Sequence, residues 1–259
     1  MFDKKISGIT MAALLLTAAC GGGGEEKSAA PAEKPAETAF VTVDPATAAT
    51  VMGKVTFEGT APKAMVINMS AEPDCSKLHG GPVHPDNWVI GEGGSLQNVF
   101  VWVKTGLEGK AFQPSTTPAV LDQKGCIYTP HVVAVQKGQP FEVKNDDPLT
   151  HNVHPLPKVN PEWNKSQTPG AAPIEYQFPR QEIMLPVKCN IHPWMRSYIS
   201  VVDHPFFAVT AADGTFTIKG LPPGTYTIEA VHEELGAKEM SVTLTDAGSA
   251  TADFAFAAK

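Results

Sequence analysis

One seven-residue segment carries three different metal donors at regular spacing. Cys189, His192 and Met195 follow one another at three-residue steps, in the run Cys189-Asn190-Ile191-His192-Pro193-Trp194-Met195. A thiolate, an imidazole and a thioether are the soft and borderline donors that copper prefers, whereas zinc is held by cysteine, histidine and carboxylates. The pattern therefore favours a copper loop over its alternative, a free buried cysteine near a core histidine and methionine.

A trigonal copper site needs a second imidazole, which we expect from a distant strand packed beside this loop. His151 lies 38 residues before Cys189 and follows a strand-like run that ends at Asn145 and a polar turn. Enough chain separates the two motifs for the connecting strands of a small β-barrel. The two motifs in this order predict one metal site.

The paired motifs resemble those of the cupredoxins, in the plastocyanin and amicyanin group, over roughly residues 111–203. The short Cys-x-x-His-x-x-Met loop, with Pro193 after the histidine, is similar to that of amicyanin, and residues 128–139 resemble the strand that precedes the first histidine ligand. The resemblance implies one type 1 copper ion in a Greek-key fold. It further implies that Asn152 ties the two ligand loops together. The implied equatorial ligands are His151, Cys189 and His192, with Met195 as the weak axial ligand.

A ligand set of this kind suits neither oxidation state of copper fully, so little must move when an electron arrives or leaves. We therefore expect a one-electron carrier rather than an enzyme. The alternative is a protein that sequesters or delivers copper, and a third, weaker hypothesis is an adhesive module with an incidental metal site. Multicopper oxidases and nitrite reductases typically need His-x-His pairs, and this chain has eight histidines and no such pair.

The expected partner is a redox protein such as a c-type cytochrome or an envelope oxidoreductase. Trp194 and Pro193 stand beside the candidate ligand His192, where related proteins have an exposed apolar patch for docking. A neighbouring domain covering Trp194 is the other possibility. The formal net charge is −7 and no cluster of Lys and Arg stands out, so a nucleic-acid partner is not expected.

The elements that must position these donors are short β-rich runs broken by Gly, Pro, Asn and Asp. Such runs predict an all-β fold of sandwiches or barrels. Residues 155–179 hold six prolines and are interpreted as a long irregular excursion of the chain, a connecting loop rather than a strand. The expected strands are 52–57, 66–69, 99–103, 131–135, 141–144, 183–188, 198–202, 215–218, 225–230 and 240–244.

Residues 206–228 closely resemble the carboxypeptidase regulatory-like, transthyretin-like β-sandwich. In that segment Asp213-Gly214 forms one hairpin turn and Pro222-Pro223-Gly224 the next. The opening strand of that family has its counterpart at 53–59, before the copper region. We therefore predict a sandwich split into 48–110 and 204–258, with a cupredoxin domain at 111–203 inserted in it. The alternative is that residues 51–110 add strands to the cupredoxin.

The N-terminus predicts export. Lys4 and Lys5 precede an apolar run that ends in small residues and Cys20, which resembles a bacterial lipoprotein signal over residues 1–20. Cys20 is the expected lipidation site, and Gly21 after it is similar to the pattern that sends such proteins to the outer membrane, on its periplasmic face. Residues 21–47 hold few large apolar residues and are expected to form a disordered tether.

An exported protein folds where cysteines tend to pair, and we expect a disulfide between Cys75 and Cys126. Cys189 then remains as the free thiol. A second metal site formed by these two cysteines with His79 and His84 is the alternative.

Overall fold

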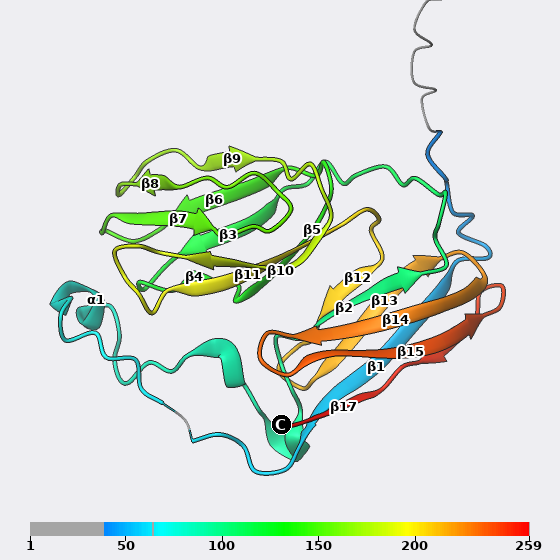
Figure 1. Ribbon diagram of the computed structural model, residues 1–259, viewed down its shortest axis with the longest axis horizontal. Helices are drawn as coiled ribbons and strands as arrows, with labels where there is room; N and C mark the ends of the chain where they lie inside the picture. The colour runs from blue at the N-terminus through cyan, green and yellow to red at the C-terminus, as the bar shows by residue number, and fades with distance from the viewer. Residues whose placement is uncertain (1–38, 64, 259) are drawn as a thin grey trace, which may run out of the picture. The chain divides into compact units, whose positions relative to one another are not determined.

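The computed structural model of the chain describes residues 39–63 and 65–258. This part holds 17 strands, one short α-helix, α1 (Pro73–Lys77), and two 3-10 turns, η1 (Asp86–Trp88) and η2 (Glu92–Gly94) (Figure 1). The all-β prediction is confirmed. No helix in these residues is long and apolar enough to cross a membrane. The predicted signal peptide and Cys20 lie outside the described residues.

Nine strands form what we call the donor sandwich, because it carries the candidate metal donors. One sheet has the order β5-β11-β10-β7-β8 and the other β4-β3-β6-β9. Alternate residues point inward along these strands. In β6, Phe141, Val143 and Asn145 are buried. The bounds are β3 (Ala119–Gln123), β4 (Tyr128–Thr129), β5 (Val132–Gln136), β6 (Phe141–Asn145), β7 (His151–Pro155), β8 (Lys165–Gln167), β9 (Ile174–Tyr176), β10 (Glu182–Lys188) and β11 (Arg196–Val202).

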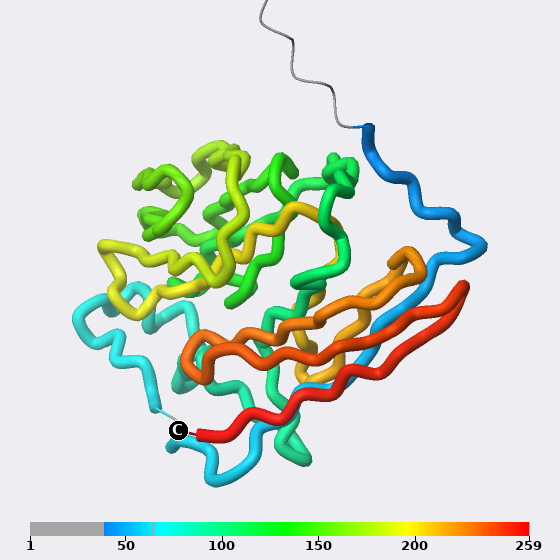
Figure 2. Tube along the Cα trace, turned by 45° about the vertical axis from the view of Figure 1, so that its right-hand side comes forward, coloured from blue at the N-terminus to red at the C-terminus, as the bar shows by residue number. Residues whose placement is uncertain are grey.

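The remaining strands form the flanking sandwich, with sheets β13-β1-β16 and β12-β2-β14-β15, and with β17 also paired to β1. Figure 2 follows β1 in blue beside the C-terminal strands in orange and red. Strands from both sides of residues 111–203 thus share one sandwich, although the predicted domain bounds stay a prediction. The strands are β1 (Ala49–Glu58), β2 (Phe100–Thr105), β12 (Phe207–Val209), β13 (Thr215–Leu221), β14 (Gly224–His232), β15 (Gly236–Leu244), β16 (Ser249–Thr251) and β17 (Phe254–Ala257).

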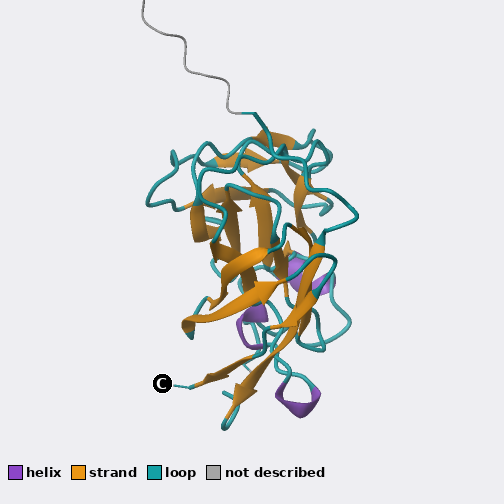
Figure 3. Ribbon diagram, turned by 90° about the vertical axis from the view of Figure 1, so that its right-hand side faces the viewer, coloured by secondary structure: helices purple, strands orange, loops and turns teal. Residues whose placement is uncertain are grey.

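Apolar side chains join the two sandwiches. Phe100 and Trp102 of β2 pack in one buried cluster with Val132 of β5 and Val202 of β11. The strands of both sandwiches are visible in Figure 3. Burying large apolar and aromatic surface here stabilises their association.

The segment between β1 and β2 contains no strand at 66–69, so that prediction is wrong. It carries α1, η1 and η2 instead, and Pro73 at the start of α1 supplies the fixed φ that suits a first helical turn. A disulfide joins Cys75 of α1 to Cys126, just before β4. This cross-link attaches the segment to the donor sandwich.

Two further expectations require correction. The proline-rich excursion 155–179 contains two short strands, β8 and β9, because its residues between the prolines can still pair with β7 and β6. The tether was expected to extend to residue 47, but Phe40 forms a β-bridge with Ala111 and the Val41 N–H donates to the Ala111 carbonyl at 2.7 Å. A paired backbone of this kind is an ordered contact.

Candidate metal centre

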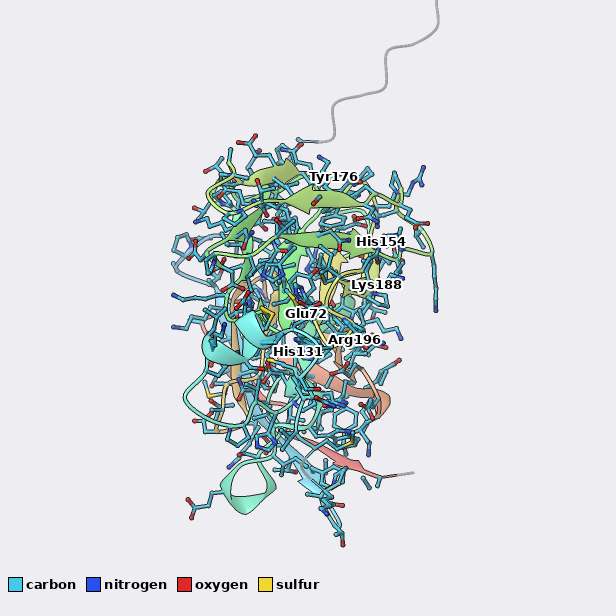
Figure 4. All side chains as sticks on the ribbon, turned by 90° about the vertical axis from the view of Figure 1, so that its left-hand side faces the viewer. Glu72, His131, His154, Tyr176, Lys188 and Arg196 are labelled. Atoms are coloured by element: carbon cyan, nitrogen blue, oxygen red, sulfur yellow. A yellow bond between two sulfur atoms is a disulfide. The ribbon has the colours of Figure 1, made fainter. Side chains whose placement is uncertain are left out.

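Two loops at one end of the donor sandwich carry the candidate donors. His151 is the first residue of β7, directly after the β6–β7 turn, and Cys189, His192 and Met195 lie on the short connection between β10 and β11. Antiparallel pairing of β10 with β7 sets Lys188 opposite His154, which brings the two loops together. Figure 4 labels Lys188 and Arg196, which flank the connection on its two sides.

Backbone hydrogen bonds close the β10–β11 connection on itself. The Cys189 N–H donates to the Met195 carbonyl at 3.2 Å, and the Met195 N–H donates to the His192 carbonyl at 3.0 Å. The loop is therefore held in one shape by its own backbone. Met195 is buried in the same apolar cluster as Cys189.

The donor atoms of His151, Cys189 and His192 all lie within 4.8 Å of one another. The two Nδ1 atoms are 2.9 Å apart, and the Cys189 sulfur lies 3.7 Å from His192 Nδ1. The three residues are only 0, 2 and 3% exposed. The structure thus brings together three of the four predicted ligands in a buried cluster.

This spacing fits a shared metal ion. Two nitrogens that each lie about 2.0–2.1 Å from one ion, as in zinc–histidine bonds, are about 3 Å apart at an angle near 90–100°. A thiolate with two imidazoles is the donor chemistry of trigonal copper sites. His151, Cys189 and His192 therefore fit copper as equatorial ligands, and Met195 remains the predicted axial one.

Asp147 fixes the orientation of His151. Its Oδ2 lies 2.8 Å from His151 Nε2, and its two oxygens accept the backbone N–H groups of Gly125 at 2.6 Å and Cys126 at 2.7 Å. With Nε2–H donated to the carboxylate, Nδ1 presents its lone pair to the cluster. The sequence motifs did not single out Asp147, although a carboxylate in the turn four residues before an expected ligand was a usable signal.

Asn152 joins the two ligand loops. Its Oδ1 accepts the Asn190 N–H at 2.7 Å and lies 3.3 Å from the Cys189 sulfur. The His192 N–H also donates to that sulfur, at 3.4 Å. These contacts hold the sulfur in place, and the N–H of His192 offsets negative charge on it.

The pKa shifts in the cluster favour the thiolate of Cys189 and the charged form of His151, but the neutral form of His192. Burial raises the pKa of the Cys189 thiol, but hydrogen bonds from His151 and from nearby N–H groups outweigh burial, so the pKa falls below its ordinary value. Burial lowers the pKa of His151, whereas Cys189 and Asp147 raise it, with a net rise. Burial, followed by the charge of His151, lowers the pKa of His192.

The disulfide lies directly against the cluster. The sulfurs of Cys75 and Cys126 and a ring nitrogen of His192 lie within 4.8 Å of one another. The segment before β2 thus covers His192. The histidines of the alternative second metal site bond elsewhere, since His79 Nε2 lies 2.7 Å from the Gly125 carbonyl and His84 Nδ1 lies 2.6 Å from the Met65 carbonyl.

The two expected docking residues differ in exposure. Pro193 is exposed, as is its neighbour Ile191. Trp194 is half-buried, its ring lies 5.3 Å from that of His192, and its Nε1 donates to the Cys126 carbonyl at 3.0 Å. The fold therefore leaves Pro193 and Ile191 open and covers part of Trp194.

Residues 198–257 match the model of the carboxypeptidase regulatory-like domain family. No curated protein matches the chain. The match begins within β11, so it spans the last strand of the donor sandwich and β12–β17.

Several solved structures are similar to part of the chain. They include a purple cupredoxin from Nitrosopumilus maritimus (19% identity, 32% of this chain and 98% of that one, TM-score 0.28). A reduced tryptophan-to-tyrosine mutant of amicyanin shows 20% identity over 34% of this chain and 84% of its own, with a TM-score of 0.30. A copper-containing nitrite reductase from Thermus scotoductus SA-01 shows 20% identity over 38% of this chain, with a TM-score of 0.30, and this chain spans 24% of it. Function is therefore inferred from the geometry of the cluster itself.

Proposed function

We propose that this protein is a type 1 copper protein that carries single electrons. The observation that carries the proposal is the buried convergence of His151 Nδ1, His192 Nδ1 and the Cys189 sulfur, with the outer nitrogen of His151 bonded to Asp147. Bound copper would supply one-electron redox chemistry at that point. The chain itself supplies a fixed, dry set of donors.

The rigidity of the donors supports a carrier over the alternative of copper sequestration or delivery. Delivery requires ligands that exchange easily, whereas these three side chains are almost fully buried and are held by Asn152, Asp147 and the closed backbone of the loop. Donors fixed in this way need little rearrangement on electron transfer, which suits a carrier.

The other histidines support a single centre without catalysis. His154 contacts Glu162 at 2.6 Å, His204 contacts the Val103 carbonyl at 2.8 Å, and His131 contacts Glu233 at 2.5 Å. Each has a structural partner in the described part of the chain. We therefore propose no enzymatic activity.

We further propose that the protein is lipid-anchored through Cys20 at the periplasmic face of the outer membrane. The support is the leader sequence that ends at Cys20. Its electron partner is a protein such as a c-type cytochrome or an envelope oxidoreductase, which would approach the exposed Pro193 and Ile191 beside His192.

A visible spectrum tests the proposal. The mature protein with one equivalent of Cu(II) should show an intense thiolate-to-copper charge-transfer band, and the band should disappear in Cys189→Ser. The matched control is Ser200→Ala, a small buried change on β11 away from the donors, which should keep the band. A colourless Cu(II) complex of the wild type, or an intense band in Cys189→Ser, would contradict the proposal.

A further inference from the structure

A cavity of about 350 Å³ lies beside Trp194, among four parts of the chain that are distant in sequence. Its lining comes from the segment between β1 and β2, from Ile127 and His131 next to β4 and β5, from Trp194 with the start of β11, and from the turn between β14 and β15. Cavities of this size accept small ligands of about one ring. Figure 4 labels two of its lining residues, His131 and Arg196.

A buried pair of side chains, His131 and Glu233, forms part of the cavity lining. His131 Nε2 lies 2.5 Å from Glu233 Oε1, and the two side chains are 7 and 8% exposed. Burial raises the pKa of the Glu233 carboxyl, but the hydrogen bond and charge of His131 outweigh burial and lower it. Burial and hydrogen bonding to Glu233 both raise the pKa of the Tyr198 hydroxyl beside them. Glu233 is therefore an ionised carboxylate that already has a partner, His131.

A second carboxylate in the wall has no such partner. Asp86 is half-buried on η1, and its side chain accepts no hydrogen bond and forms no ion pair within the described residues. Burial raises the pKa of Asp86, His131 lowers it, and Glu233 raises it, with a net rise. A half-buried carboxylate without a donor is only partly hydrated, and a cationic ligand would stabilise its ionised form.

Three apolar or aromatic side chains also line the cavity, Ile67, Ile127 and Trp194. Because the indole Nε1 of Trp194 already donates to the Cys126 carbonyl, Trp194 offers its ring rather than a polar atom. An aromatic ring attracts a cation held near its face. These three side chains suit the apolar body of a ligand that also carries a charge.

The charges around the cavity favour a cation. The acidic side chains are Asp86, Glu233 and Glu234, and among the described residues the Glu234 carboxylate accepts hydrogen bonds only from the neutral donors of Asn87 and Trp88. Against them stand Arg196, which is exposed and forms no ion pair with a described residue, and two histidines, His131 and His84. Unless both histidines are protonated, at least one negative charge is in excess.

We propose that this cavity binds a small organic ammonium ion with an apolar, ring-sized body, and that Asp86 is its counter-ion. This ligand site is additional to the proposed electron-transfer function, and ligand binding there does not require bound copper. An experiment that disproves ligand binding would therefore leave the copper proposal untouched, and the reverse also holds.

Calorimetric titration of the mature chain with three ligands of one shape tests the ligand class. The ligands are benzylammonium, benzyl alcohol and benzoate, each added to copper-free and to copper-loaded protein. We expect one benzylammonium per chain in both forms, with benzyl alcohol weaker by at least about tenfold, as the loss of a charge-assisted hydrogen bond implies. Equal affinity for the three ligands, or no binding of benzylammonium, would overturn the proposal.

Substitutions of two oppositely charged lining residues, Asp86 and Arg196, test their roles in ligand binding by the copper-free protein. Asp86→Asn should weaken benzylammonium binding by about tenfold or more, Asp86→Glu should retain most of it, and Arg196→Gln should strengthen it by removing a like charge. The control Glu175→Gln alters an exposed carboxylate on β9 and should leave the affinity unchanged. Thermal melts of each variant check the fold.

Two outcomes would replace the proposed ligand by another. Weaker binding in Arg196→Gln would mean that the guanidinium attracts part of the ligand, as for a zwitterion or an anion. Displacement of benzylammonium by equimolar Ca²⁺ would mean that the carboxylates hold an inorganic cation. Either result would overturn the organic ammonium ligand.

Discussion

The carboxylate of Asp147 lies 2.8 Å from Nε2 of His151, on the side of the ring that faces away from Cys189 and His192. The same carboxylate accepts the backbone N–H groups of Gly125 and Cys126. One side chain therefore connects a candidate metal ligand to the loop that carries the disulfide. Its removal should affect the metal centre without removing any donor.

We predict that Asp147→Asn weakens copper binding by about 10–100-fold, the usual cost of losing a partner of a metal-bound histidine. Competition with a copper chelator measures this affinity. Asp146→Asn is the matched control, because Asp146 is the exposed neighbour in the same turn. Equal copper affinities in the wild type and Asp147→Asn would show that Asp147 does not orient His151.

Met195 should tune the metal rather than hold it, because a long axial thioether adds little affinity but shifts the balance between oxidation states. Met195→Leu should keep the thiolate charge-transfer band and raise the reduction potential, since losing a donor destabilises Cu(II) more than Cu(I). Voltammetry with visible spectra measures both quantities. An unchanged potential, or loss of copper binding, would exclude Met195 as the axial ligand.

His151→Ala serves as the comparison for Met195→Leu. It removes an equatorial donor, so the site should open to water or added imidazole and the band should change in position and strength. Added imidazole should restore part of the original spectrum. A spectrum identical to that of the wild type would exclude His151 from the ligand set.

The disulfide should stabilise the chain by restricting its unfolded state. We predict that the double variant Cys75→Ser/Cys126→Ser loses about 2–4 kcal/mol of unfolding free energy, measured by denaturant titration of the copper-free protein. In the wild type, alkylation without reductant after unfolding should label Cys189 and leave Cys75 and Cys126 unlabelled. Labelling of all three cysteines would contradict the disulfide.

Glu182 anchors the proline-rich segment after β7. Its carboxylate accepts the N–H groups of Lys158 at 2.5 Å and Asn160 at 2.9 Å, and the side-chain amide of Asn160 at 2.9 Å. Burial raises the pKa of Glu182, but these hydrogen bonds outweigh burial and lower it. Because the folded pKa lies below the unfolded value of about 4.3, the stabilisation is complete above that pH and is lost as the pH falls through the folded pKa.

We predict that Glu182→Gln costs about 1–3 kcal/mol at pH 7, since an amide group then faces backbone donors. The difference from the wild type should shrink below about pH 4. Urea titrations at pH 7 and pH 3.5 measure it, with Glu175→Gln as an exposed control. A difference that stays constant with pH would show that the charge of Glu182 is not the stabilising element.

The sequence by itself indicated the candidate donors and determined the class of fold. Cys189, His192 and Met195 lie on one short loop, so their spacing along the chain already limits how far apart they can be. Alternating apolar residues and turn residues indicated strands and thus the all-β class. The same signals predicted a strand at 66–69 that is absent, and they missed β8 and β9 within 155–179. In both places a strand forms only if a neighbouring strand is available to pair with it.

Only the tertiary structure decided what surrounds those donors. Asp147 contacts His151 because of a turn conformation, and the disulfide lies against His192 because a segment outside the donor sandwich folds over it. The cavity brings Asp86 beside Glu233, from parts of the chain that no local pattern connects. Contacts between segments distant in sequence arise from strand pairing and the burial of shared apolar surface, and neither is encoded in the spacing of the residues that meet.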